Sequence, residues 1–325
     1  MSDTTLRPWT TAFVKNRVRL SEQTPLLVLV VLCTVASIAS ENFLTPFNIT
    51  NLLLQAAVIA VITIGMTYVI VAGGFDLSVG SVVALSGCLA AQTMLHFGIV
   101  AGIIVGGATG AAVGLINGLV ITQLRVSPFI ATLASMVLFR GVALIITQGA
   151  PVVGDEGLPA SFVHFGVGRW LGIPLLVWAA LVLAVVCGWI LHRTILGTRI
   201  FAVGGSREAA LLAGIMVERV TTTAYVICGT LAGLAGVMLA ARLQSGQPTA
   251  GEFYELTAIA AVILGGASLQ GGEGRLHRSL IGVLIMTVLA NTLNLIGVDS
   301  YWQRVTIGVV LVAAAAADQA RRRFS

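Results

Sequence analysis

Uninterrupted apolar runs constrain the fold of this chain more than any other feature. Most of them approach the roughly 20 residues that a helix needs to cross a bilayer. They cover residues 25–40, 52–72, 78–95, 99–121, 129–147, 173–191, 220–241, 256–266, 279–297 and 302–317. Charged residues make up only 10% of the chain, against about 25% in a soluble domain. We therefore predict an all-α polytopic membrane protein with about ten transmembrane helices, of which 256–266 is the shortest and least well bounded.

Lys and Arg residues indicate the orientation of these helices, because they concentrate in cytoplasmic loops. With the N-terminus inside, only Arg169 and Arg242 fall in predicted outer loops, while Arg140 and Arg304 fall within spans. The other basic residues lie inside: Arg7, Lys15, Arg17, Arg19, Arg125, Arg193, Arg199, Arg207, Arg219, Arg275, Arg278, Arg321, Arg322 and Arg323. The prediction is an N-in/C-in protein with a cytoplasmic tail (1–24), a transmembrane domain (25–317) and a basic tail (318–325). The first apolar run is expected to stay as a span rather than be cleaved as a signal peptide.

The net charge of +5 follows from this inner bias, so no nucleic-acid partner is expected. Arg140 and Arg304 are expected to pair within the protein or to reach an interface, since an unpaired charge in a bilayer costs a few kcal/mol or more.

No residue pattern typical of an enzyme or a metal site occurs in the chain. The four cysteines are widely separated, and neither a Gly-x-Ser-x-Gly nor a His-Glu-x-x-His sequence is present. A phosphate-binding P-loop needs a lysine after its second glycine, but the only lysine is Lys15, in FVKNR. We therefore predict no catalytic, cofactor-binding or metal-binding residues, and any ATP and Mg²⁺ would bind to a partner subunit.

The longest predicted inner loop, 192–219, contains the features of a short helix. Gly204 and Gly205 precede Ser206, which suits an N-cap, and Glu208 follows in the first turn, where the helix dipole favours an acid. The sequence from Glu208 is half apolar, so its apolar side needs a covering partner. The alternative is an amphipathic helix on the membrane surface, which normally carries more Lys and Arg than this segment does.

Four sequence blocks resemble permease subunits of bacterial ATP-binding-cassette (ABC) importers of the ribose and related monosaccharide class. This class is distantly related to the branched-chain amino acid permeases. The blocks are VAGGFDLSVGSVVAL, the segment from Asn117 to Gly149, AVGGSREAALLAGI, and AAVILGGASLQGGEG from Ala260 to Gly274. They occur in the family's order, and the resemblance covers nearly the whole chain after the first span.

This resemblance implies a vitamin B12-importer-type (type II) fold in the bacterial cytoplasmic (inner) membrane. It also implies a pore made by two permeases, identical or paralogous, together with a separate ATPase, often a tandem one, and a periplasmic sugar-binding protein. Six residues would form the ATPase-docking segment: Ser206, Arg207, Glu208, Ala209, Leu212 and Gly214. Arg169 and Arg242 are candidates for docking the binding protein, although both also have nearby acidic groups or lipid phosphates to neutralise.

The stretch VAGGFDLSVGS follows the second predicted span. Gly73 and Gly74 permit a sharp reversal, and Asp76 or Ser78 can cap the next helix. We expect this turn at the cytoplasmic mouth, where water is available. One interpretation is a capped turn alone; the other, from the related fold, is that these four residues form an inner gate of the pore.

Two functional classes remain at this stage. The first is an ABC-importer permease, for which ribose, another pentose, a hexose, a polyol and a furanose-like signalling molecule all fit the sequence. The second is an autonomous secondary transporter or channel for a small polar solute. Branched-chain amino acids are disfavoured as substrates, because the Gly-Gly-x-Asp-Leu-Ser form resembles the sugar branch.

Overall fold

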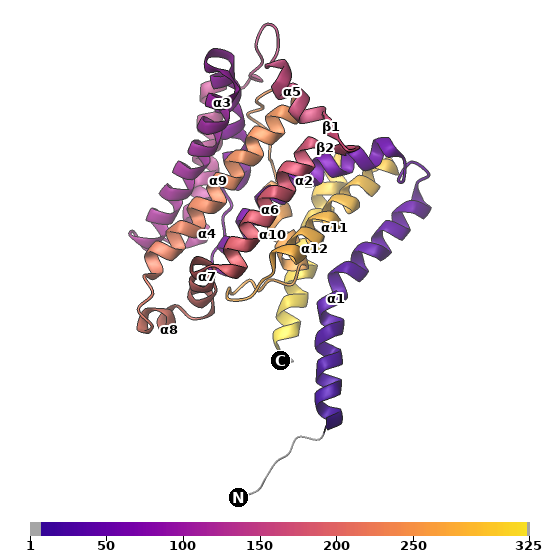
Figure 1. Ribbon diagram of the computed structural model, residues 1–325, viewed down its shortest axis with the longest axis vertical. Coiled ribbons are helices and arrows are strands. Elements are labelled where there is room, and N and C mark those ends of the chain that lie inside the picture. The colour runs from indigo at the N-terminus through magenta and orange to yellow at the C-terminus, as the bar shows by residue number, and fades with distance from the viewer. Residues whose placement is uncertain (1–7, 324–325) are drawn as a thin grey trace, which may run out of the picture.

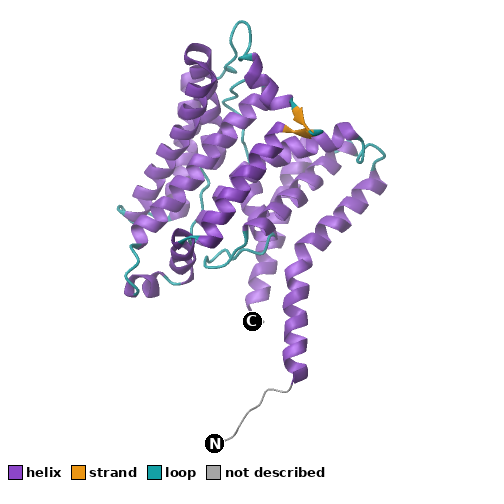
Figure 2. Cartoon of the chain, in the orientation of Figure 1, coloured by secondary structure: helices purple, strands orange, loops and turns teal. Residues whose placement is uncertain are grey.

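The computed structural model describes residues 8–323 of the chain, which are almost entirely helical (Figures 1 and 2). The elements are α1 (Pro8–Ala39), α2 (Pro46–Val71), α3 (Val79–Thr122), α4 (Pro128–Thr147), α5 (Ala160–Val167), β1 (Arg169–Trp170), β2 (Ile173–Pro174), α6 (Leu175–Arg193), α7 (Ile195–Gly205), α8 (Arg207–Leu212), α9 (Val217–Leu243), α10 (Tyr254–Leu264), α11 (Leu276–Leu295) and α12 (Ser300–Arg323). The strands β1 and β2 pair as a two-stranded antiparallel hairpin.

The prediction of an all-α polytopic membrane protein is confirmed. Six described helices are long and apolar enough to cross a membrane: α2, α3, α4, α6, α9 and α11. Each of the other predicted runs also contains helix, in α1, α10 and α12. Helix α1 begins at Pro8 and α12 continues to Arg323, so both enter ranges that were assigned to tails. Arg7 lies outside the described residues.

Helix α3 covers two of the predicted spans because it reverses direction at Gly98. This glycine has φ 83° and ψ 173°, which interrupts the helical backbone. A Cβ atom on Gly102 would lie 2.7 Å from the Ala90 carbonyl oxygen, and one on Gly106 would lie 3.5 Å from that of Ser86. In a straight helix, residues 20 apart would be about 30 Å apart. The halves 79–97 and 99–122 therefore pack side by side as a hairpin.

A ridge of glycines on the second half of α3 packs against α9. These glycines occur at every fourth position: Gly106, Gly110, Gly114 and Gly118. A Cβ on Gly110 would collide with the Gly229 carbonyl oxygen, and one on Gly114 with that of Tyr225. Small residues at this spacing let two helix backbones approach closely in a membrane. The α3–α9 pair is the most extensive helix contact in the described chain.

The ends of the bundle differ in what they carry. The start of α1, the end of α12 and the helices α7 and α8 lie at one end, which we call the α8 end (Figure 1). Helix α5 and the β1–β2 hairpin lie at the opposite end, the α5 end (Figures 1 and 2). This placement agrees with a chain whose two described ends share one side of the membrane.

Helix α10 is too short to cross a bilayer alone. Its 11 residues span about 16 Å at 1.5 Å per residue, roughly half the hydrocarbon thickness. The preceding segment 244–253 is irregular, and its Gly246 forms an isolated bridge with Val152. Irregular backbone at membrane depth must be buried in protein or line a water-filled cavity.

Substituting Gly110→Ala should destabilise the bundle, because its Cβ would meet the Gly229 carbonyl oxygen. Gly107→Ala is the matched control, since a Cβ there makes only an ordinary 3.6 Å contact with Leu234 Cδ2. We expect Gly110→Ala to lower the free energy of unfolding by about 1–3 kcal/mol, as overpacked interiors do. Thermal unfolding of the detergent-purified proteins measures the difference, and equal midpoints for the two variants would contradict this packing.

Candidate functional site

The turn between α2 and α3 holds a buried carboxylate. Asp76 is 1% exposed and Ser78 is fully buried. Asp76 Oδ1 accepts hydrogen bonds from the Ser78 backbone N–H at 2.9 Å and from the Ser78 hydroxyl at 2.5 Å. Of the two residues expected to cap α3, Asp76 thus binds an amide at the helix start, whereas the Ser78 side chain makes no capping bond.

The hydrogen bonds continue from this turn into two helices. Asn117, on the second half of α3, donates from Nδ2 to Ser78 Oγ at 2.9 Å. Ser135, on α4, donates to Asn117 Oδ1 at 2.5 Å. We call Asp76, Ser78, Asn117 and Ser135 the Asp76 network. In the sequence, Asn117 and Ser135 lie in the block from Asn117 to Gly149 that resembles the permease family, and no role was assigned to either residue. The signal that could have identified them is a polar residue within an apolar run.

The expectation that Asp76 meets water at the mouth of the pore is wrong in this chain. A Cβ on Gly74 would lie 2.6 Å from the Tyr225 hydroxyl, which itself donates to the Phe75 carbonyl at 2.9 Å. Tyr225 is eight residues into α9, or about 12 Å from the helix start. After Gly73 (φ 84°) the chain therefore turns back into the bundle, and Asp76 lies inside the protein rather than at its surface.

The short helix predicted after Ser206 in the inner loop is α8, which covers Arg207–Leu212. Ser206 is its N-cap, and its side chain accepts a hydrogen bond from the Ala209 N–H at 3.2 Å. Ala210 packs into the protein at 3% exposure, whereas Leu212 is 91% exposed. Glu208, Ala209 and Gly214 are exposed as well. An apolar side chain that the chain leaves uncovered thus projects from the α8 end.

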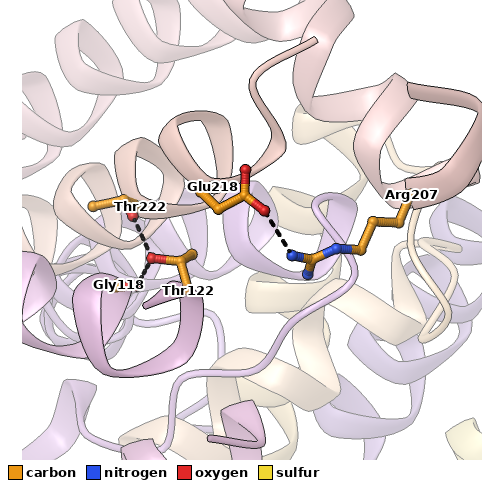
Figure 3. A network of polar contacts seen from close by, with 5 residues as sticks. All are labelled: Gly118, Thr122, Arg207, Glu218 and Thr222. Atoms are coloured by element: carbon orange, nitrogen blue, oxygen red, sulfur yellow. Dashed lines mark hydrogen bonds and ion pairs between the residues drawn. The ribbon is translucent and has the colours of Figure 1, made fainter. Parts of the chain in front are cut away.

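Arg207 makes an ion pair within the chain. Its Nη2 lies 3.2 Å from Glu218 Oε1 on the first turn of α9, with both side chains about half exposed at 55% and 52% (Figure 3). Beside this pair, Thr122 and Thr222 share a 3.2 Å hydrogen bond that joins the end of α3 to α9 (Figure 3).

An open cleft of about 730 Å³ lies at the α8 end, between the α8 segment (residues 203–211) and the neighbouring turns. Its lining includes Gly73, Gly74, Arg125, Arg207, Tyr225 and Gln270. One wall therefore belongs to the α2–α3 turn and another to the α8 segment. The cleft connects the surface around α8 with the turn that leads to Asp76.

The two arginines predicted within spans have different surroundings. Arg140, on α4, donates from Nη1 to the carbonyl oxygens of Pro248 and Ala250 at 2.6 and 2.7 Å, and from Nη2 to that of Gly80 at 3.2 Å. It thus joins the irregular segment 244–253 to the start of α3. The Arg304 side chain is 55% exposed, and its Nη2 lies 3.7 Å from Glu252 Oε2. Internal pairing was expected, but backbone carbonyls as the partners of Arg140 were not.

The outer candidates lie at the α5 end and are not equally accessible. Arg169 is on β1 and exposed, whereas Arg242 is in the last turn of α9 and only partly exposed. Among the described residues, no group of three or more His, Cys, Asp or Glu side chains is placed to hold a metal ion.

Comparison with known proteins decides the family. Residues 48–315 match the family described as "Branched-chain amino acid transport system / permease component". The chain belongs to this permease family. With its apolar helices, it is a multi-pass protein of the bacterial cytoplasmic membrane.

Similar proteins include permeases named for the import of pentose sugars. The ribose import permease protein RbsC of Bacillus subtilis is 50% identical over 298 residues, covering 91% of this chain and 92% of the relative. The Escherichia coli K12 protein of the same name is 44% identical over 305 residues, covering 93% and 95%. An L-arabinose ABC transporter permease protein, AraH of Azospirillum brasilense, is 41% identical over 301 residues, covering 91% and 87%. No solved structure matches the permease significantly.

Replacing Arg140 in the permease with leucine should leave three interior carbonyl oxygens without their donor. Hydrogen bonds to charged groups contribute about 1.5–3 kcal/mol each, so we expect Arg140→Leu to lower the free energy of unfolding by at least about 2 kcal/mol. Arg304→Leu is the control, because an exposed ion pair contributes about 0–1 kcal/mol. Thermal unfolding in detergent compares them; a loss as large for Arg304→Leu would contradict the role of Arg140.

Proposed function

We propose that this permease is the membrane subunit of an ABC importer that carries a monosaccharide into the cell. The names of its relatives support a sugar rather than a branched-chain amino acid, since the similar proteins named above are ribose and L-arabinose permeases. A pentose is the substrate class that these names share. The observation that carries the proposal is the 50% identity to a ribose import permease over nearly the full length of both chains.

Energy for transport would come from a separate cytoplasmic ATPase, often a tandem one in this class, that binds ATP and Mg²⁺. The support is the only lysine, Lys15, which excludes a P-loop, together with α8. Leu212 would insert into a cleft of the ATPase, with Ser206, Glu208, Ala209 and Gly214 around it. Arg207, the first residue of α8, would contribute from the start of the helix, where its guanidinium forms an ion pair with Glu218.

The membrane topology proposed here has ten spans with both termini in the cytoplasm. It counts the two halves of α3 separately, together with α2, α4, α6, α9, α11 and the apolar parts of α1 and α12. The remaining span combines the short helix α10 with the irregular segment 244–253 that precedes it. The α8 end is then cytoplasmic. We further propose the vitamin B12-importer-type fold and a pore shared by two permeases, identical or paralogous.

The inner gate would be the turn that contains Gly73, Gly74, Asp76 and Ser78. Its support is the Asp76 network, which joins this turn to α4, and the cleft that reaches the turn from the α8 side. On the periplasmic side, a sugar-binding protein would dock at the α5 end. Arg169 is the stronger contact candidate there because it is exposed, and Arg242 the weaker.

Co-expression of the permease with its ATPase and binding protein tests this function. We expect the ATPase to co-purify in mild detergent, and labelled ribose or L-arabinose to enter proteoliposomes only when the ATPase and ATP are present. Uptake without any ATPase would contradict the proposal and favour the secondary transporter or channel.

The double substitution Glu208→Lys and Leu212→Asp should abolish co-purification and uptake, because it places charge on the exposed side of α8. Gln123→Lys with Leu124→Asp is a matched control, since both residues are exposed at the same end of the bundle but lie outside α8. Co-purification that survives the α8 changes, or is lost equally in the control, would refute docking through α8.

Asp76→Asn tests the gate separately, because the amide keeps an acceptor for Ser78 but removes the charge. We expect uptake to fall about 2- to 30-fold, the range that coupling changes of 0.5–2 kcal/mol produce, while the ATPase still co-purifies. Ser86→Ala is the control, since the buried Ser86 hydroxyl has no hydrogen-bond partner among the described residues. Normal uptake by Asp76→Asn would leave this carboxylate with a capping role only.

A further inference from the structure

Three glycine pairs from separate parts of the sequence meet at the α8 end. Gly73 and Gly74 follow α2, Gly204 and Gly205 end α7, and Gly271 and Gly272 lie between α10 and α11. A Cβ on Gly271 would lie 2.7 Å from the Gly73 Cα, and one on Gly272 would lie 2.7 Å from the Gly205 Cα. We call this contact the glycine junction.

Backbone atoms of the three segments are in direct contact at the junction. The Gly272 N–H donates to the Val71 carbonyl oxygen at 2.9 Å. A Cβ on Gly204 would collide with that same oxygen and lie 2.6 Å from the Gly272 nitrogen. Because the contacting residues are glycines, they have no side chain that could change rotamer when one segment is displaced. A displacement of one segment must therefore move the segment that it contacts.

The position of the junction links two parts of the proposed machinery. Gly204 is two residues before Ser206, the N-cap of α8. Val71 and Gly73 lie immediately before the turn that buries Asp76. The junction therefore lies on the short path between α8 and that turn.

A second path from α8 runs through its other end to α9, and it uses side chains rather than direct contact between backbones. Ala210 belongs to the same apolar core as Val217 of α9, and Arg207 forms a half-exposed ion pair with Glu218, which contributes little because exposed pairs are screened by water. The return turn adds a backbone bond from the Ile215 N–H to the Ala210 carbonyl oxygen at 3.0 Å, within the same loop.

We propose that the glycine junction transmits displacement of α8 to the Asp76 turn, with Gly204 as the positioning residue that makes the contact rigid. This inference rests on the proposed function, in which an ATPase moves α8. Gly204 suits a test better than Gly271 or Gly272, because their φ values of 91° and 73° would make any side chain strained in its own backbone.

Gly204→Ala and Gly205→Ala are a matched pair one residue apart. A Cβ on Gly204 collides with the Val71 carbonyl oxygen, whereas one on Gly205 meets nothing within 4 Å. The readout is sugar uptake per ATP hydrolysed by the complete transporter in proteoliposomes. We expect Gly204→Ala to lower this ratio about tenfold, within the usual range of coupling factors, with the ATPase still bound. Gly205→Ala should keep the wild-type ratio.

A second variant covers the case in which Gly204→Ala does not accumulate. In this variant two glycines are inserted between Gly205 and Ser206, both of which are exposed. The insertion leaves the junction and α8 intact but makes the connection between them flexible, so the uptake per ATP hydrolysed should also fall. A wild-type ratio in either variant that accumulates would overturn the proposal, as would a lowered ratio in Gly205→Ala. Failure of the unaltered chain to bind an ATPase would instead contradict the proposed function itself.

Discussion

Close backbone contact between α3 and α9 is the interaction on which the rest of this permease depends. The hydrophobic effect does not draw helices together within a bilayer, because lipid tails are as apolar as the side chains. Glycines at every fourth position of α3 remove the side chains between the helices, so dispersion contacts form over the backbones. Helix α2 packs on the same α9, with Gly65 against Cys228. The α3–α9 pair therefore positions both helices that flank the Asp76 turn.

Backbone that leaves a helix inside the membrane must still find hydrogen-bond partners, and this constraint explains the buried polar residues. The start of α3 obtains an acceptor from Asp76, and the carbonyls of Gly80, Pro248 and Ala250 obtain a donor from Arg140. Both charged side chains thus complete the backbone of interrupted helices. Both serve breaks between helices, which continuous spans would not contain.

Local signals in the sequence predicted local structure well. Hydropathy indicated the apolar helices, and Ser206 followed by Glu208 indicated the cap of α8, because capping depends on residues three positions apart. The depth of Asp76 and the partners of Arg140 depend instead on Tyr225 and on residues 248–250, more than 100 positions away along the chain. Hydropathy averaged along the chain carries no information about such pairings. The four-residue spacing of the α3 glycines is present in the sequence, but that spacing does not identify α9 as the helix they contact.

Glycine serves two mechanical purposes in this permease. Along α3 and α9 the contact extends over many turns, so a local push is distributed and the pair behaves as a rigid unit. At the glycine junction the contact involves only a few residues from three segments of the chain, so a push there acts on one short segment. Because α2 packs along α9, the part of that segment outside the helix contact is the turn from Gly73 to Ser78. A displacement of α8 would therefore deform this turn before it deforms the bundle, which is the order of events that an inner gate requires.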